Sequence, residues 1–155
     1  MYLLSIDPGL SKCGVAYFDR AGRLVRAYCA RRPRDCESPR GPIAWGYMAK
    51  AIDFENVGAL VIEQMQVDTR TRGKERDLLE VCGVVGVLIG VATAARIPVH
   101  AYKPRTWKGN TPKTVTQARA LDALTKEEKA RINPNATHDT YDAIALGQFH
   151  MERNK

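Results

Sequence analysis

The order of strand-like and helix-like segments predicts an α/β domain, in which a mixed five-stranded sheet is flanked by helices. Three short apolar segments, at residues 2–6, 13–18 and 24–30, follow one another across turn-forming residues, which is typical of an antiparallel meander. Beyond residue 42, helix-like and strand-like segments alternate. The chain has 155 residues, the size of one domain, so we expect residues 1–155 to form a single unit.

The first half of the chain contains four of the expected strands. The first runs into the turn Asp7-Pro8-Gly9, and Gly22 suits a hairpin turn between the second and third. After an Arg/Pro-rich loop at 31–42, apolar residues at helical spacing predict a helix over 43–52. Residues 60–62 then form a buried-type strand that ends at Glu63.

The second half is predicted to be mainly helical. Residues 74–95 begin with mixed charge and become almost wholly apolar, and their length favours a buried helix over a strand. A last strand follows at 97–101. Thr111-Pro112 is expected to begin a helix that ends near Leu124, with a short helical piece at 125–131. Thr137 suits the N-cap of a final helix that ends near Met151.

The charge distribution favours a polyanionic partner. The formal net charge is +7, with 24 Lys and Arg against 17 Asp and Glu. Residues 81–121 contain six positive charges and no acid. The longest apolar stretch, 81–95, is interrupted by glycines and is shorter than the roughly 20 residues that cross a bilayer. No basic leader precedes the first apolar residues, so we expect a cytoplasmic protein without a membrane partner.

Four acidic residues stand where strands end or where the last helix begins. Asp7 and Glu63 follow apolar strands, and if these strands are parallel neighbours, both carboxylates emerge at the same edge of the sheet. Asp139 and Asp142 are three residues apart and share a helix face that continues as an apolar stripe, through Ala143. Close carboxylates repel unless cations neutralise them, and hard oxygen ligands suit Mg²⁺ or Mn²⁺. Two such ions about 4 Å apart could activate a water for phosphodiester hydrolysis.

Each acid taken alone also has an ordinary structural explanation. Asp-Pro-Gly is a common turn sequence, and Glu63 could pair with a local arginine. Acids in the first turn of a helix interact favourably with its dipole. The joint pattern favours a site, because all four acids are expected at one edge of the sheet.

Three segments together resemble the RuvC-type Holliday junction resolvases of the ribonuclease H-like superfamily. These are Leu4-Ser-Ile-Asp-Pro-Gly-Leu-Ser-Lys-Cys-Gly-Val-Ala16, Val61-Ile-Glu-Gln64 and His138-Asp-Thr-Tyr-Asp-Ala143. The resemblance implies a ribonuclease H-like fold and a homodimeric endonuclease that nicks four-way DNA junctions symmetrically. It also implies a Mg²⁺ cofactor, with Mn²⁺ as a substitute and two ions in each active site.

Carried over position by position, the resemblance assigns roles to individual residues. Asp7, Glu63, Asp139 and Asp142 match the metal-binding catalytic acids. Lys108 and Lys113 resemble lysines that approach DNA phosphates near the cut, and Lys113 is counted among the catalytic residues. We also expect DNA contacts from Arg70, Arg72 and Arg105.

The chain departs from the resemblance at two places. Many relatives have an aromatic residue two positions after the Glu-Gln pair, where this chain has Gln66. Met65, Tyr102 or Trp107 could replace it, although such residues are more often part of a core. His138 precedes Asp139 and is a candidate for positioning a ligand or transferring a proton. The helix near 78–95 could form a dimer contact, and burial within one subunit explains its composition equally well.

The leading hypothesis is a metal-dependent, junction-resolving endonuclease. A related nuclease acting on flaps, forks or other branched DNA is the first alternative. A junction-binding module without catalysis is the second, and it is disfavoured because a pure binder gains nothing from clustered negative charge at a DNA surface. A nucleotide cofactor of the sugar-kinase type is not expected, since 155 residues leave no room for a second lobe.

Overall fold

The computed structural model describes residues 1–34, 36–38, 40–65 and 75–155. One sheet has the strand order β3-β2-β1-β4-β5. The strands are β1 (Tyr2–Asp7), β2 (Lys12–Phe18), β3 (Leu24–Arg31), β4 (Val57–Glu63) and β5 (Val99–Tyr102). β2 pairs antiparallel with both β1 and β3, whereas β4 pairs parallel with both β1 and β5. The predicted mixed five-stranded sheet is confirmed, and the condition set for the acidic site, that the first and fourth strands are parallel neighbours, is met.

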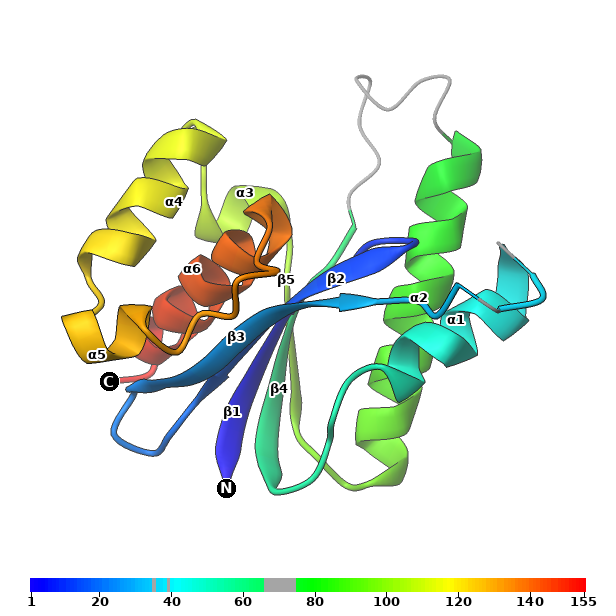
Figure 1. Cartoon of the computed structure of the whole chain (residues 1–155), viewed down its shortest axis with the longest axis horizontal. Coiled ribbons are helices and arrows are strands. Elements are labelled where there is room, and N and C mark those ends of the chain that lie inside the picture. Colours follow the sequence, from blue (N-terminus) through cyan, green and yellow to red (C-terminus); the bar gives the residue numbers. More distant parts are fainter. Residues whose placement is uncertain (35, 39, 66–74) are drawn as a thin grey trace.

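Helices cover both faces of this sheet. They are α1 (Gly41–Lys50), α2 (Glu75–Ala94), α3 (Pro104–Trp107), α4 (Lys113–Asp122), α5 (Lys126–Lys129) and α6 (His138–Arg153). Figure 1 shows α1 and α2 on one side of the sheet, with α4, α5 and α6 on the other. Strand side chains alternate between the two sides, so Leu60 and Ile62 join the core beneath α1 and α2, while Val61 joins the core beneath α6.

Close packing of α6 on the sheet sets the position of its first turn. Gly14 lies in β2, and a Cβ atom added there would overlap the backbone carbonyl of Asp139. Gly147 permits a similar approach against the ring of Phe18. The two glycines allow the whole length of α6 to lie directly on the sheet, which brings the start of the helix to the end of β1.

The ends of the elements differ from the sequence expectations in a few places. Pro112, rather than Thr111, is the N-cap of α4. The single turn α3 was not expected, because four residues are too few to show a helical period. The last strand is shifted to Val99–Tyr102. Thr137 is the N-cap of α6, as predicted, and its backbone N–H donates to Thr140 Oγ1 at 3.1 Å.

Helix α2 is long and apolar enough, by length and composition alone, to cross a membrane, and among the described helices it is the one that passes this test. Val84 and Leu88 are nevertheless fully buried and belong to the core that includes Leu60 and Ile62. Packing of this kind is what a core helix of a globular α/β protein requires.

Candidate active site

The four predicted acids lie together at one edge of the sheet. Asp7 ends β1 and Glu63 ends β4, and the parallel pairing of these strands brings the two ends side by side. Asp139 and Asp142 join them from the beginning of α6. All four line a cleft of about 310 Å³. The prediction that these acids meet is therefore confirmed as geometry.

Three lysines form ion pairs with these carboxylates. Lys108 Nζ lies 3.1 Å from Glu63 Oε2 and 4.0 Å from Asp142 Oδ2. Lys113 Nζ lies 2.9 Å from Asp142 Oδ2 and 3.8 Å from Asp139 Oδ1.

The third lysine is Lys12, whose Nζ lies 3.1 Å from Asp139 Oδ2. Lys108 and Lys113 were predicted on the resemblance, whereas Lys12 was not. Its signal in the sequence is weak: one charged residue between a turn and an apolar strand.

Two buried side chains donate hydrogen bonds to two of the acids. Trp107 Nε1 donates to Glu63 Oε2 at 2.8 Å. Gln117 Nε2 donates to Asp142 Oδ1 at 2.9 Å and to the backbone carbonyl of His138 at 3.1 Å. The amide oxygen of Gln117 faces His138 Nδ1 at 3.2 Å. Trp107 and Gln117 are both buried and keep their carboxylates in one orientation.

The electrostatics of the cleft are unbalanced at Asp7. Burial, followed by the negative charges of Glu63, Asp142 and Asp139, raises the pKa of the Asp7 carboxyl well above its ordinary value of 3.8, and Lys108 only partly opposes this. In the described part of the chain, no lysine or arginine lies within ion-pair distance of Asp7. An ionised Asp7 therefore requires a further positive charge in the cleft.

The pKa of Lys113 is also raised, which for a lysine favours the charged form. Burial alone would lower the pKa of its ammonium group. The hydrogen bond and charge of Asp142, together with Asp7 and Asp139, outweigh burial and raise this pKa above its ordinary value of 10.5. Lys113 consequently stays charged across the physiological pH range.

The donor chemistry of the cleft fits a hard divalent cation. All four acids offer carboxylate oxygens, the ligands that Mg²⁺ and Mn²⁺ prefer, and a bound cation would oppose both the burial and the neighbouring charges that raise the pKa of Asp7. Among the described residues, no group of three His, Cys, Asp or Glu side chains is already gathered as a ligand cage. The carboxylate oxygens are instead engaged by lysines.

The other predicted site residues are less central. Arg105 lies on α3, where it is exposed and outside the lining of the cleft. His138 is exposed and its ring contacts Gln117. The predicted DNA contacts Arg70 and Arg72, and the departure at Gln66, lie outside the described residues.

Of the three residues considered as replacements for the missing aromatic residue, Met65 is the one that lines the cleft. The other two candidates have internal partners, because Trp107 bonds Glu63 and the Tyr102 hydroxyl lies 2.9 Å from His150 Nδ1.

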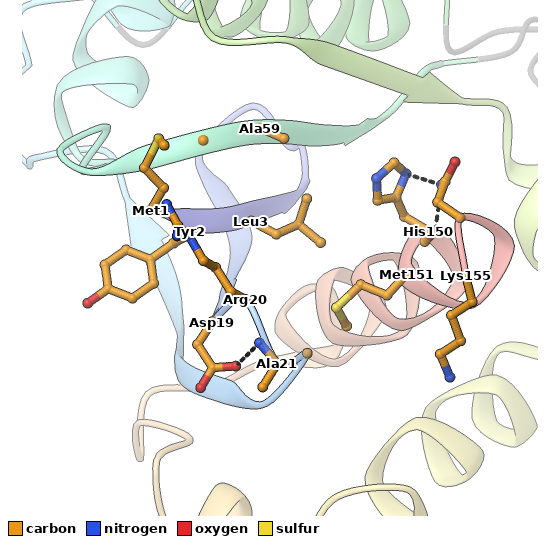
Figure 2. A pocket seen from close by; sticks show the side chains of 13 residues that line it. Met1, Tyr2, Leu3, Asp19, Arg20, Ala21, Ala59, His150, Met151 and Lys155 are labelled. Atoms are coloured by element: carbon orange, nitrogen blue, oxygen red, sulfur yellow. Dashed lines mark hydrogen bonds between the residues drawn. The ribbon is translucent and has the colours of Figure 1, made fainter.

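A larger hollow of about 570 Å³ lies at the opposite end of the sheet (Figure 2). Its one acid, Asp19, stabilises a turn by accepting from the backbone of Ala21 at 2.9 Å and by pairing with Arg23 at 2.8 Å. His150, which also lines it, accepts at Nδ1 from Asn154. This hollow is therefore larger than the acidic cleft, but no reactive side chains converge in it. The candidate active site is the acidic cleft.

Comparisons with known proteins found relatives both by sequence and by fold. No family model matches the chain. The crossover junction endodeoxyribonuclease RuvC of Leifsonia xyli subsp. xyli (strain CTCB07) is 27% identical, over 97% of this chain and 74% of that protein.

Three solved structures have a similar fold. T. thermophilus RuvC in complex with a Holliday junction substrate has a TM-score of 0.68 at 18% identity, covering 97% of this chain and 93% of that one. The Fowlpox virus resolvase, in complex with substrate Holliday junction DNA, has a TM-score of 0.61 at 14% identity, with coverages of 97% and 99%. The yeast mitochondrial Holliday junction resolvase has a TM-score of 0.64 at 12% identity, with coverages of 98% and 81%.

The fold is that of the RuvC-type resolvases, a ribonuclease H-like fold. In sequence the chain is similar to RuvC, and in fold it is similar to RuvC and to other Holliday junction resolvases. The resemblance drawn from the three sequence segments is thereby confirmed.

Proposed function

We propose that this protein is a metal-dependent endonuclease that resolves four-way DNA junctions by paired symmetric nicks. The observation that carries the proposal is the cleft in which four carboxylates and three lysines meet at the end of β1 and β4. The similar Leifsonia protein is a crossover junction endodeoxyribonuclease, and two of the similar structures are complexes with Holliday junctions.

The four acids would hold the metal, which is Mg²⁺, or Mn²⁺ as a substitute, with two ions in each site. When bound, the metal supplies an activated water and offsets the charge of the phosphodiester. Trp107 and Gln117 hold Glu63 and Asp142 in the orientation that ligation needs. Lys108 and Lys113 present their ammonium groups to the phosphate and stabilise the charge that develops there. Lys113 suits this role because its raised pKa keeps it charged.

DNA outside the cleft would be held by arginines. Arg105 is exposed on α3, only three residues from Lys108, so it can reach a phosphate next to the one being cut. Arg70 and Arg72 are proposed for the strands that leave the junction. Because these contacts are with the backbone, their loss should weaken binding to all sequences alike and reduce its salt dependence.

Symmetric nicking requires two sites, and we propose that a homodimer forms through α2. Leu79, Cys82, Gly86 and Gly90 are exposed and lie on one face of α2, opposite the buried Val84, Val85 and Leu88. Leu79 is 69% exposed, and a second copy of α2 packed on this face would bury its side chain. Light scattering should show that the wild-type protein is a dimer and that Gly86→Arg, which places a large charged side chain on this face, is a monomer. A monomeric wild-type protein at micromolar concentration would contradict this interface.

A cleavage assay tests the proposed activity. The protein is incubated with a labelled four-way junction, a Y-fork and a linear duplex, each with Mg²⁺ and with a chelator. Paired nicks confined to the junction are expected, and Asp7→Asn and Glu63→Gln should abolish them while junction binding survives. Equal cutting of the fork would favour a general branched-DNA nuclease, whereas binding without cutting would favour a non-catalytic module. The proposed location is the cytoplasm, either that of a bacterial cell or that of the host if a phage encodes the protein.

A further inference from the structure

Lys12 is a charged residue of the cleft to which the proposed mechanism gives no role. It begins β2, directly after the loop that follows Asp7. Its ammonium group pairs with Asp139 Oδ2 at 3.1 Å, and 42% of its side chain is exposed. The pairing partner of Lys12 across the sheet is Arg31, which is exposed, so the positive charge continues outward from the cleft along β3.

The lysines engage the same oxygens that a metal would need. At Asp142, Gln117 occupies Oδ1 and Lys113 occupies Oδ2. A cation bound to Asp142 at Oδ2 would therefore lie close to the ammonium group of Lys113. At Asp139, Lys12 occupies Oδ2 in the same way. A divalent cation and an ammonium group repel each other at such separations, so metal binding weakens the attachment of the lysine to the carboxylate.

The three lysines of the cleft are held less firmly than the two buried side chains that contact the acids. Gln117 and Trp107 are buried and their hydrogen bonds are fixed by helix packing. The lysine side chains are 42%, 48% and 22% exposed, in the order Lys12, Lys113, Lys108. A long, half-exposed side chain can swing into solvent at small cost, because exposed ion pairs contribute little to stability.

We infer that Lys12, with Lys113, is an exchangeable counterion of the acidic cleft. A divalent cation displaces its ammonium group from Asp139, and the released group then binds a phosphate of the DNA beside the cleft. Lys12 is thereby a further DNA-contacting residue, and metal and DNA support each other's binding through it. This inference rests on the proposed metal-dependent function.

The first test measures Mn²⁺ binding to the protein alone by isothermal titration calorimetry. Lys12→Met should bind Mn²⁺ roughly threefold to tenfold more tightly than the wild-type protein, because a competing charge has been removed. Lys126→Met is the matched control: it removes the same charge from an exposed position on α5 and should leave Mn²⁺ affinity unchanged. Lys12→Arg should stay close to the wild-type value.

Thermal unfolding provides a second measurement that does not depend on activity. In chelator, Lys12→Met should melt only slightly below the wild-type protein, because Asp139 keeps its ion pair with Lys113 and an exposed ion pair contributes little to stability. Saturating Mn²⁺ should raise the melting temperature of Lys12→Met more than that of the wild-type protein. Lys12→Gln is a second variant if Lys12→Met does not fold.

Stopped-flow binding to a labelled junction, read before cleavage, tests the DNA contact. With Mn²⁺, Lys12→Met should bind the junction about threefold to tenfold more weakly, and the slope of log affinity against log salt should fall by about one. In chelator the variant should differ little from the wild-type protein. Equal losses in both buffers would overturn the exchange.

The outcomes separate this inference from the proposed function. If the wild-type protein binds no divalent cation, the proposed function fails. If it binds Mn²⁺ but Lys12→Met binds Mn²⁺ equally or more weakly, the counterion role is wrong and the proposed function stands.

Discussion

Replacing Gln117 by leucine should remove the buried one of the two α4 side chains that hold Asp142, and leave the ion pair with Lys113. The amide of Gln117 makes one hydrogen bond to the Asp142 carboxylate and another to the backbone carbonyl of His138. A hydrogen bond to a charged group contributes about 1.5–3 kcal/mol and a neutral one about 1 kcal/mol. Leucine has a similar volume and restores part of this by apolar burial, so Gln117→Leu should lower the free energy of unfolding by roughly 2–3 kcal/mol.

This loss corresponds to a fall in melting temperature of about 5–10 °C for a chain of this size. Urea unfolding at pH 7 in chelator measures the free energy directly. Mn²⁺ affinity, read by calorimetry, should also fall, because Asp142 is no longer held in one orientation.

Gln148→Leu is a suitable control for this prediction. Gln148 also links the two helices, since its Nε2 on α6 donates to the carbonyl of Ala120 on α4 at 3.1 Å, yet it touches none of the four acids. It should cost about 1 kcal/mol and leave Mn²⁺ affinity unchanged. A loss below about 0.5 kcal/mol for Gln117→Leu, or equal effects of both variants on Mn²⁺ binding, would refute the reasoning.

Three other perturbations have defined outcomes. Because the fold raises the pKa of Asp7, its ionisation destabilises the folded protein as pH rises above 3.8. Asp7→Asn should therefore have a higher melting temperature than the wild-type protein in chelator at pH 7, and this difference should disappear below pH 3.8. Cleavage should be lost at every pH. Burial acts to raise the pKa of Glu128, but backbone N–H donors, among them Leu24 at 2.6 Å, lower it overall; its stabilisation should therefore be complete above pH 4.5 and disappear as pH falls through the lowered value, and Glu128→Gln should flatten the acid limb of a pH–stability curve. Gly14→Ala should lower the free energy of unfolding, measured in urea, by more than about 3 kcal/mol and weaken Mn²⁺ binding, since the added Cβ overlaps the backbone of Asp139. Near-wild-type stability would mean that α6 can move away from the sheet without loss of stability.

The sequence by itself determined the order of the strands and of the helices other than α3, together with the acids of the cleft. Asp7 and Glu63 could be recognised because each ends an apolar strand, and Asp139 and Asp142 because they interrupt the face of an otherwise apolar helix. These signals are local: a charged side chain within a run of buried positions is conspicuous wherever the run folds. The alternation of strands and helices predicted a mixed sheet, whereas the parallel pairing of β1 with β4 was only a condition of the predicted site, and the structure meets it.

Tertiary structure alone decided which residues support those acids. Nothing near Gln117 or Lys12 in the sequence distinguishes either from an ordinary polar residue, because their partners Asp142 and Asp139 are distant in the chain. Their roles depend on how closely α4 and α6 pack and on the contact of α6 with Gly14. Side-chain hydrogen bonds and ion pairs act over about 3–4 Å, so they are set by the final packing of the helices on the sheet and not by residue type or spacing.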